Sequence, residues 1–209
     1  VFLDTETTSL RGDTRLPWEI AMIRVDEFAD LEPDSPNPDA VEKIRMFIDG
    51  VDLSDADPFS LQIGRFYERH PRQNGLAVST DTVVDSTEPS AGRPSWVDGP
   101  FFDLYTEEAA MHIVDRWTRG ATIVGAVPSF DMQTLETRMR WHGLCPSWSH
   151  RPVCVENLVA GRVQWLPENR LQGMGKAAEQ LGIKIDLADA HTAMGDAELA
   201  RRIFDEVFA

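Results

Sequence analysis

Short apolar runs and longer amphipathic segments divide the chain. The runs Val1–Asp4 and Glu19–Val25 are rich in Ile, Val, Leu and Phe, which is typical of adjacent buried strands. Lys43–Ile48 is predicted to be a third strand that closes a meander with them. Ala121–Val127 is a continuous apolar run, the pattern of a fully buried strand. The chain is therefore expected to build its core around a sheet.

Helical periodicity predicts helices over these segments: Phe59–His70, Thr106–Arg119, Ser129–His142, Gly173–Leu181 and Ala193–Phe208. Thr106 is of a residue type that caps helix N-termini, and a glycine directly follows the second, third and fourth segments, as is common where helices end. Strands first, and then helices alternating with strands, indicate an α/β or α+β fold around one mixed sheet.

Two irregular segments interrupt this pattern. Asp30–Asp39 is acidic and rich in proline, and Ser86–Asp103 contains three prolines and two glycines. Aromatic side chains in the second segment predict that it packs against the rest of the protein. We interpret the regions near 26–40 and 86–103 as loop insertions in one domain that spans residues 1–209, a length that fits a domain of ordinary size.

The chain is acidic, with 35 Asp and Glu residues against 20 Lys and Arg residues and a formal net charge of −15. A protein that coats duplex nucleic acid needs a basic face to neutralise phosphates, so this class is excluded. Either the contact with nucleic acid is short and mediated by metal ions, or the protein does not act on nucleic acid. Many acidic residues fall in the loop-like segments Asp26–Asp57 and Asp81–Asp103, which could lie away from a site.

The sequence also predicts a cytoplasmic location without membrane contact. No stretch approaches the roughly 20 apolar residues that span a bilayer, and the first residues do not form a signal peptide. Cys145 and Cys154 have neither metal-ligand nor redox spacing, so we expect two free, buried thiols in a reducing compartment. Because the first strand begins abruptly, we expect the natural protein to have a few residues before Val1.

Acidic residues occupy positions where the surrounding pattern is apolar. Asp4 and Glu6 are two residues apart, so in a strand they project from the same face. Two like charges at the end of a buried strand repel each other and lose hydration, which costs several kcal/mol without a compensating partner. Helix capping and solvation, the usual roles of acidic residues, do not apply inside a buried strand.

Asp131 and Asp196 repeat this pattern on predicted helices. Asp131 lies four residues before Leu135 on a buried stripe, and Asp196 shares a stripe with Ala200 and Ile203. Taken singly, Asp131 could cap its helix, and Asp196 could be a first-turn charge that the helix dipole favours. Taken together, the four carboxylates call for hard cations, Mg²⁺ or Mn²⁺ rather than zinc.

Three short segments resemble the exonuclease motifs of DnaQ-like nucleases in their DEDDh form. DTETT (Asp4–Thr8) is similar to the first motif, PSFD (Pro128–Asp131) to the second and HTAMGD (His191–Asp196) to the third. WEIAMIRVD (Trp18–Asp26) resembles the second strand of this family, and AAEQLGI (Ala177–Ile183) resembles the helix before the third motif. The resemblance spans nearly the whole chain, and it is specific because the motifs occur in order and in the expected elements.

This resemblance implies a ribonuclease-H-like α/β fold, with a mixed central sheet flanked by helices, and 3′–5′ exonuclease activity on the 3′ ends of single-stranded DNA or RNA. Two metal ions, Mg²⁺ or Mn²⁺, would be held by four carboxylates: Asp4, Glu6, Asp131 and Asp196. The resemblance implies His191 as the general base, and we expect three residues to contact the substrate: Thr7, Thr8 and Phe130. The acidic surface suggests short substrates or delivery of the substrate by a protein partner.

The chain departs from the family pattern at two places. Ser9 stands where glycine is common, and Ala126 and Val127 stand where a His-Asn pair is frequent. Both changes concern contacts to the terminal nucleotide rather than the metal ligands. Two alternative functions remain open: a binding or scaffold protein that keeps the fold without turnover, and a phosphodiesterase of dinucleotides or short oligonucleotides, with which the negative charge is consistent.

Overall fold

In the residues that the structure describes, six strands form one mixed sheet in the order β4-β3-β2-β1-β5-β6. The strands are β1 (Phe2–Thr7), β2 (Pro17–Arg24), β3 (Glu42–Ile48), β4 (Leu104–Tyr105), β5 (Val124–Gly125) and β6 (Val153–Cys154). The computed structural model describes residues 1–25, 41–74, 83–85, 104–163, 171–186 and 188–209. The expected insertions near 26–40 and 86–103 lie outside these residues.

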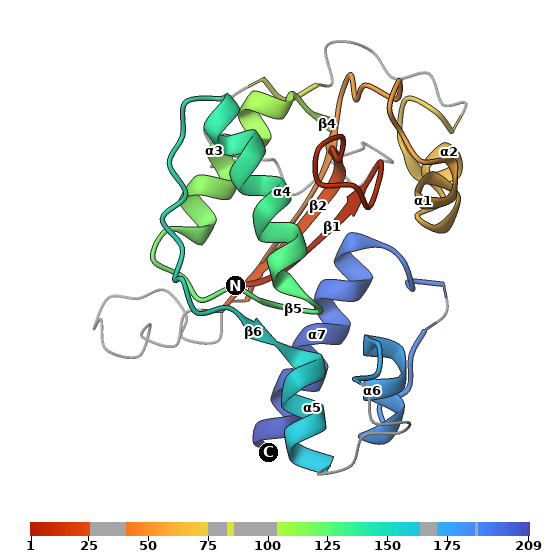
Figure 1. Cartoon of the computed structure of the whole chain (residues 1–209), viewed down its shortest axis with the longest axis vertical. Coiled ribbons are helices and arrows are strands. Elements are labelled where there is room, and N and C mark those ends of the chain that lie inside the picture. The colour runs from red at the N-terminus through yellow and green to blue at the C-terminus, as the bar shows by residue number, and fades with distance from the viewer. Residues whose placement is uncertain (26–40, 75–82, 86–103, 164–170, 187) are drawn as a thin grey trace, which may run out of the picture.

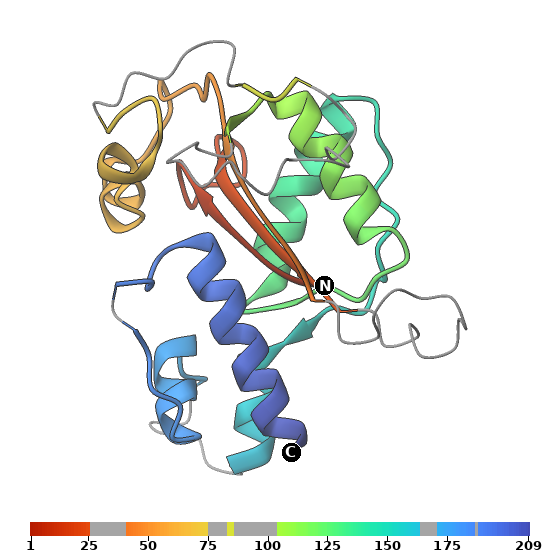
Figure 2. The ribbon, with the colours of Figure 1, turned by 180° about the vertical axis from the view of Figure 1, so that it is seen from behind.

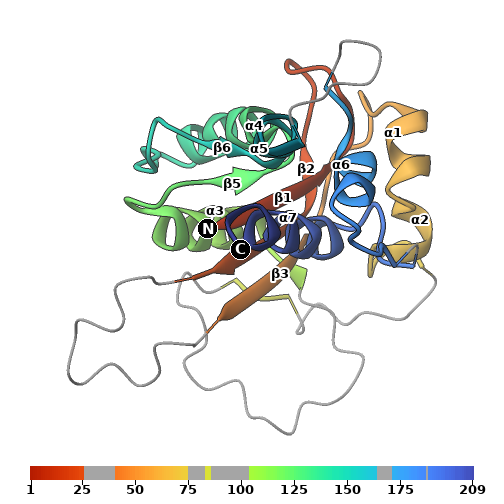
Figure 3. The same ribbon diagram turned by 90° about the horizontal axis from the view of Figure 1, so that it is seen from below.

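Helices cover both faces of the sheet. They are α1 (Pro58–Ile63), α2 (Phe66–Arg69), α3 (Glu107–Thr118), α4 (Pro128–Trp141), α5 (Val155–Val163), α6 (Met174–Gln180) and α7 (Ala193–Phe208). On one face lie α3 and α4, and on the other lies α7, backed by α5 and α6 (Figure 1, and from behind in Figure 2). Figure 3 shows α1 and α2 beyond one end of the strands. The predicted mixed sheet flanked by helices is confirmed.

Strands β1, β2 and β3 form the predicted antiparallel meander, and the alternation of side chains along them separates two cores. Leu3 and Met22 belong to the core that includes α3 and α4. Phe2 belongs to the core that includes α7. Because Asp4 and Glu6 follow Phe2 at steps of two, β1 carries both acidic side chains toward the α7 face.

Helix α7 spans the predicted residues, and a local hydrogen bond fixes its start. Thr192 is the N-cap, and its Oγ1 accepts a hydrogen bond from the Gly195 amide at 3.0 Å. Ala200 and Ile203 are buried on the stripe that the sequence predicted to face the core. This stripe holds the first turn of α7 over β1, where Asp196 lies.

The helix predicted over Phe59–His70 is wrong as a single element, because α1 and α2 are separate. The break lies at Gly64 and Arg65, and Arg65 adopts a left-handed conformation with a φ of 55°. A Cβ at Gly64 would lie 2.8 Å from both Glu6 Oε2 and the Trp18 ring, so the chain here must be glycine to pack against the sheet. The break therefore results from tertiary packing of Gly64 against Glu6 of β1 and Trp18 of β2.

Other elements differ from the sequence prediction in length or were not predicted. The strand predicted over Ala121–Val127 is reduced to β5. Helix α5 was not predicted, because its three valines and one glycine have low helix propensity. Cys145 and Cys154 are free, but the former is exposed and the latter half-buried, so the prediction of buried thiols is wrong. None of the helices in the described ranges is long and apolar enough to cross a membrane.

Candidate active site

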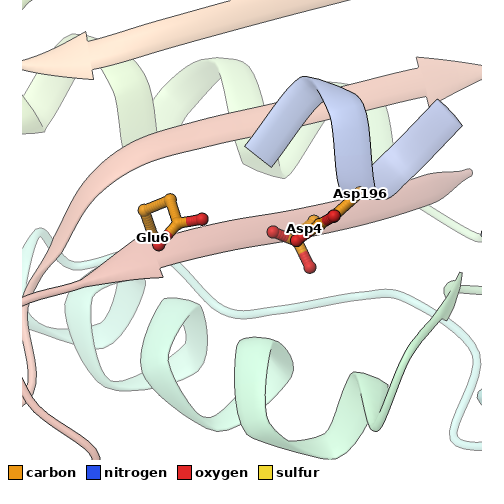
Figure 4. A group of neighbouring side chains, drawn as sticks. All are labelled: Asp4, Glu6 and Asp196. Atoms are coloured by element: carbon orange, nitrogen blue, oxygen red, sulfur yellow. The ribbon is translucent and has the colours of Figure 1, made fainter. Parts of the chain in front are cut away.

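Three carboxylates from distant parts of the chain meet between β1 and α7. Ligand oxygens of Asp4, Glu6 and Asp196 all lie within 4.8 Å of one another, and the three residues are half-buried. Figure 4 shows Asp4 and Glu6 on β1, on the side where Asp196 comes from the first turn of α7. The alternation of β1 and the packing of α7 bring these acidic groups together.

Burial and mutual repulsion make the charged forms of these groups unfavourable. Burial, and then the charges of Asp131 and Asp196, raise the pKa of Asp4 well above its usual range. Burial and the charge of Glu19 raise the pKa of Glu6 to about 7. The pKa of Asp196 is raised to about 6, mainly by burial. A divalent cation would stabilise the ionised forms and offset this cost.

Asp131 lies on the first turn of α4, in contact with β1. Its Oδ1 accepts hydrogen bonds from the Thr5 amide at 3.0 Å and from Thr5 Oγ1 at 2.6 Å, and only 3% of the residue is exposed. Burial raises the pKa of Asp131 to about 7, against the opposing effect of the bonds from Thr5. Among the described residues, the group with ligand oxygens within 4.8 Å contains Asp4, Glu6 and Asp196 but not Asp131. Asp131 borders this group, since its charge contributes to the raised pKa of Asp4.

His191 is exposed and lies just before α7, next to Asp196. Its φ of 57° is unusual for a residue with a side chain. The imidazole charge and the His191 backbone amide both lower the pKa of Asp196, against the stronger effect of burial. His191 and Asp196 line one side of a hollow of about 830 Å³, together with Met174 and Lys176 of α6 and the exposed Leu171. The structure therefore brings His191 to the acidic cluster.

Glu19 is a further buried carboxylate that the sequence analysis did not single out. It lies opposite Glu6 in the pairing of β1 with β2 and has no exposed surface. Its Oε2 forms an ion pair with Arg69 and accepts a hydrogen bond from the Ala193 amide at 3.2 Å. Its presence in the apolar run WEIAMIR was a usable signal, of the same kind as Asp4 in β1.

Arg69 links Glu19 to the segment that carries His191. Besides the ion pair, its Nη1 donates hydrogen bonds to the carbonyl oxygens of Gly64 at 2.9 Å and His191 at 3.0 Å. The guanidinium also lies 5.2 Å from the centre of the Trp18 ring. These contacts hold the backbone of His191 in place beside the acidic cluster.

The three residues predicted to contact substrate lie around the same end of β1. Thr7 Oγ1 donates a hydrogen bond to the Ser9 carbonyl at 3.1 Å, and Thr8 Oγ1 accepts one from the Leu16 amide at 3.1 Å. Both threonines are buried, and both hydroxyls stabilise the loop between β1 and β2. Phe130 is half-buried beside Asp131, under the guanidinium of Arg15. Their contact with substrate stays a prediction.

Comparison with known proteins identifies the architecture. No family model and no curated protein matches the chain. Solved structures of exonuclease I do match, over 99% of this chain. One is a zinc-bound complex of the Escherichia coli enzyme with single-stranded DNA (17% identity, TM-score 0.60). The others are a product-bound form (14% identity, TM-score 0.62) and an E. coli complex with a dT13 oligonucleotide (15% identity, TM-score 0.60). The chain has a ribonuclease-H-like fold. It spans 42% of the exonuclease I chain, and this likeness concerns the fold alone.

Proposed function

We propose that the protein is a metal-dependent 3′–5′ exonuclease that hydrolyses phosphodiester bonds at the 3′ ends of single-stranded nucleic acid. The observation that carries this proposal is the meeting of Asp4, Glu6 and Asp196 in one half-buried group. The motif resemblance favours the same activity. The shared fold supports it, since the exonuclease I structures include complexes with single-stranded DNA.

The donor atoms of the acidic cluster fit hard divalent cations. All are carboxylate oxygens, which suit Mg²⁺ or Mn²⁺ better than zinc. In the proposal, Asp4, Glu6 and Asp196 hold the metal together with Asp131, and the four carboxylates offset most of the charge of two ions. When bound, the ions supply activation of water and stabilisation of the leaving oxygen of the phosphodiester.

His191 is proposed to accept the proton of the attacking water. Imidazole titrates near neutral pH, which suits a general base. The exposed position of His191 leaves its ring accessible from the hollow, whereas its backbone carbonyl accepts a hydrogen bond from Arg69. The main chain is therefore fixed while the ring is free to meet the substrate. Such an arrangement positions a base without burying it.

The hollow beside His191 is proposed to receive the end of the strand. Its volume of about 830 Å³ lies within the range of ligand pockets, roughly 300–1,000 Å³. Leu171 and Met174 offer apolar contacts for a base, and Lys176 offers a positive charge for a phosphate. A nucleotide in this hollow would lie directly beside Asp196.

Matched DNA and RNA oligonucleotides with a 5′ label test the proposal. In Mg²⁺ or Mn²⁺ we expect a ladder of products that shorten from the 3′ end, and no cleavage after chelation of the metal.

The net charge of −15 favours a second candidate, a phosphodiesterase of dinucleotides. Faster turnover of two-residue than of twenty-residue strands would select this second candidate. Inertness on both DNA and RNA, with metal demonstrably bound, refutes both activities and leaves a binding role.

A further inference from the structure

Arg15, in the loop between β1 and β2, is a buried cation. Only 8% of the residue is exposed. Its Nε is buried and has no hydrogen-bond partner in the part of the chain that the structure describes. Buried polar groups in proteins are nearly always satisfied, because an unpaired one costs free energy. This exception therefore requires an explanation.

Two half-buried arginines of the described residues, Arg69 and Arg138, are paired with carboxylates. Arg69 forms its ion pair with Glu19, and Arg138 binds Glu107 at 2.5 Å. Arg15 instead lies over an aromatic ring, with its guanidinium carbon 3.7 Å from the centre of Phe130. Stacking of this kind satisfies the face of a guanidinium but gives no hydrogen-bond acceptor to the N–H groups in its plane.

Arg15 lies beside Asp131, which borders the acidic cluster. Phe130 directly precedes Asp131 on α4, and the charges of Arg15 and Asp131 act on each other, lowering the pKa of Asp131 and raising that of Arg15. Burial lowers the pKa of Arg15 more strongly than Asp131 raises it, but a guanidinium titrates so far above neutrality that it stays charged.

The loop that carries Arg15 is closed by its own hydrogen bonds. The Thr8 amide donates to the Leu16 carbonyl at 2.9 Å, and the Leu16 amide donates to Thr8 Oγ1 at 3.1 Å. Together with the Phe130 ring, these bonds fix both ends of the Arg15 side chain. A cation that is already ordered loses little conformational entropy when it binds a ligand.

We propose that Arg15 is a substrate-binding residue that donates its free N–H groups to a backbone phosphate of a single strand entering the site, with Phe130 as the platform that holds it. This inference rests on the proposed function. A guanidinium matches the geometry of a phosphate with two parallel hydrogen bonds. It also supplies an attractive charge beside the carboxylates, in a protein whose net charge is −15.

The salt dependence of binding tests this contact. Binding of a fluorescent single strand is measured by anisotropy at several salt concentrations, in Ca²⁺ instead of Mg²⁺, and the strand is checked afterwards to be intact. Loss of one phosphate contact reduces the slope of log K against log[salt] by about 0.7 for single strands. We expect this reduction for Arg15→Gln, with binding weakened roughly tenfold at low salt.

Arg11→Gln is the matched control. Arg11 lies on the same loop, and its replacement by glutamine removes the same charge. Its side chain is 73% exposed and is paired with Asp13. We expect Arg11→Gln to keep the wild-type slope, which separates a phosphate contact from a general change in net charge. A slope and affinity for Arg15→Gln that equal those of the wild-type protein overturn the proposal.

Arg15→Lys covers the case in which Arg15→Gln does not fold. It keeps the charge but loses the planar donor pair and the stacking, so we expect severalfold weaker binding; wild-type affinity for this variant also overturns the proposal. Failure of the proposed function has a different signature. A wild-type protein that neither binds nor cleaves DNA or RNA refutes that function, whereas equal binding by wild-type protein and Arg15→Gln refutes only the role of Arg15.

Discussion

Replacing Glu6 by glutamine isolates the electrostatic cost of the acidic cluster. Burial and the charge of Glu19 raise the pKa of Glu6 from 4.5 to about 7. At about 1.4 kcal/mol for each pKa unit, ionised Glu6 destabilises the metal-free fold by about 3 kcal/mol. Because the folded-state pKa is the higher one, this penalty is absent below pH 4.5, grows with rising pH and is complete above about pH 7.

Glu6→Gln keeps the shape of the side chain, which has to fit against Gly64 and the Trp18 ring. In chelator at pH 8, we therefore expect the variant to have a higher free energy of unfolding than the wild-type protein, by up to about 3 kcal/mol. At pH 4.5 the two should be nearly equal. In saturating Mg²⁺ the order should reverse, because the variant lacks a ligand and gains less from metal binding.

Denaturant unfolding at these pH values, with and without metal, measures all three differences. Glu42→Gln, at the exposed start of β3, is the matched control. Its unfolding free energy should differ from that of the wild-type protein by the same amount at every pH, with and without metal. If Glu6→Gln destabilises the metal-free protein at pH 8, or if its effect does not depend on pH, then repulsion in the cluster does not favour the proposed binding of a cation.

Three further variants test the positioning of the site. Arg69→Ala should lower the free energy of unfolding by about 3–5 kcal/mol, since it leaves Glu19 buried without its partner. Because it also releases the backbone of His191, it should lower kcat more than it raises KM. His191→Gln should lower kcat by roughly 10²–10⁴ while calorimetry shows unchanged metal affinity. Thr5→Val removes the hydroxyl bond to Asp131, and its unfolding free energy should fall by about 1 kcal/mol; an unchanged value would show that the amide alone holds Asp131.

The elements and residues that the sequence predicted well are those with a local signal. The stripe of α7 and the alternation of β1 follow from period and polarity alone, so the meeting of Asp4, Glu6 and Asp196 was predictable once both were assigned. Strands of two residues, such as β4 and β6, are too short to carry a period. The break between α1 and α2 depends on contacts of Gly64 with another element, which no local pattern records.

The same distinction explains which site residues were overlooked. Glu19 is visible as an acid in an apolar run, but the pattern predicts it at the first position of its strand. In the structure β2 begins at Pro17 and carries Glu19 into the sheet opposite Glu6. Arg69 and Arg15 had no local signal, because an arginine in a helix or loop is ordinarily solvated. They are distinguished by the groups that they contact after folding. Arg69 contacts a buried carboxylate. Arg15 contacts an aromatic ring, and its Nε has no acceptor among the described residues. The clustered acidic residues are therefore recognisable from the apolar sequence around them, whereas the arginines that lie beside them are recognisable only from the structure.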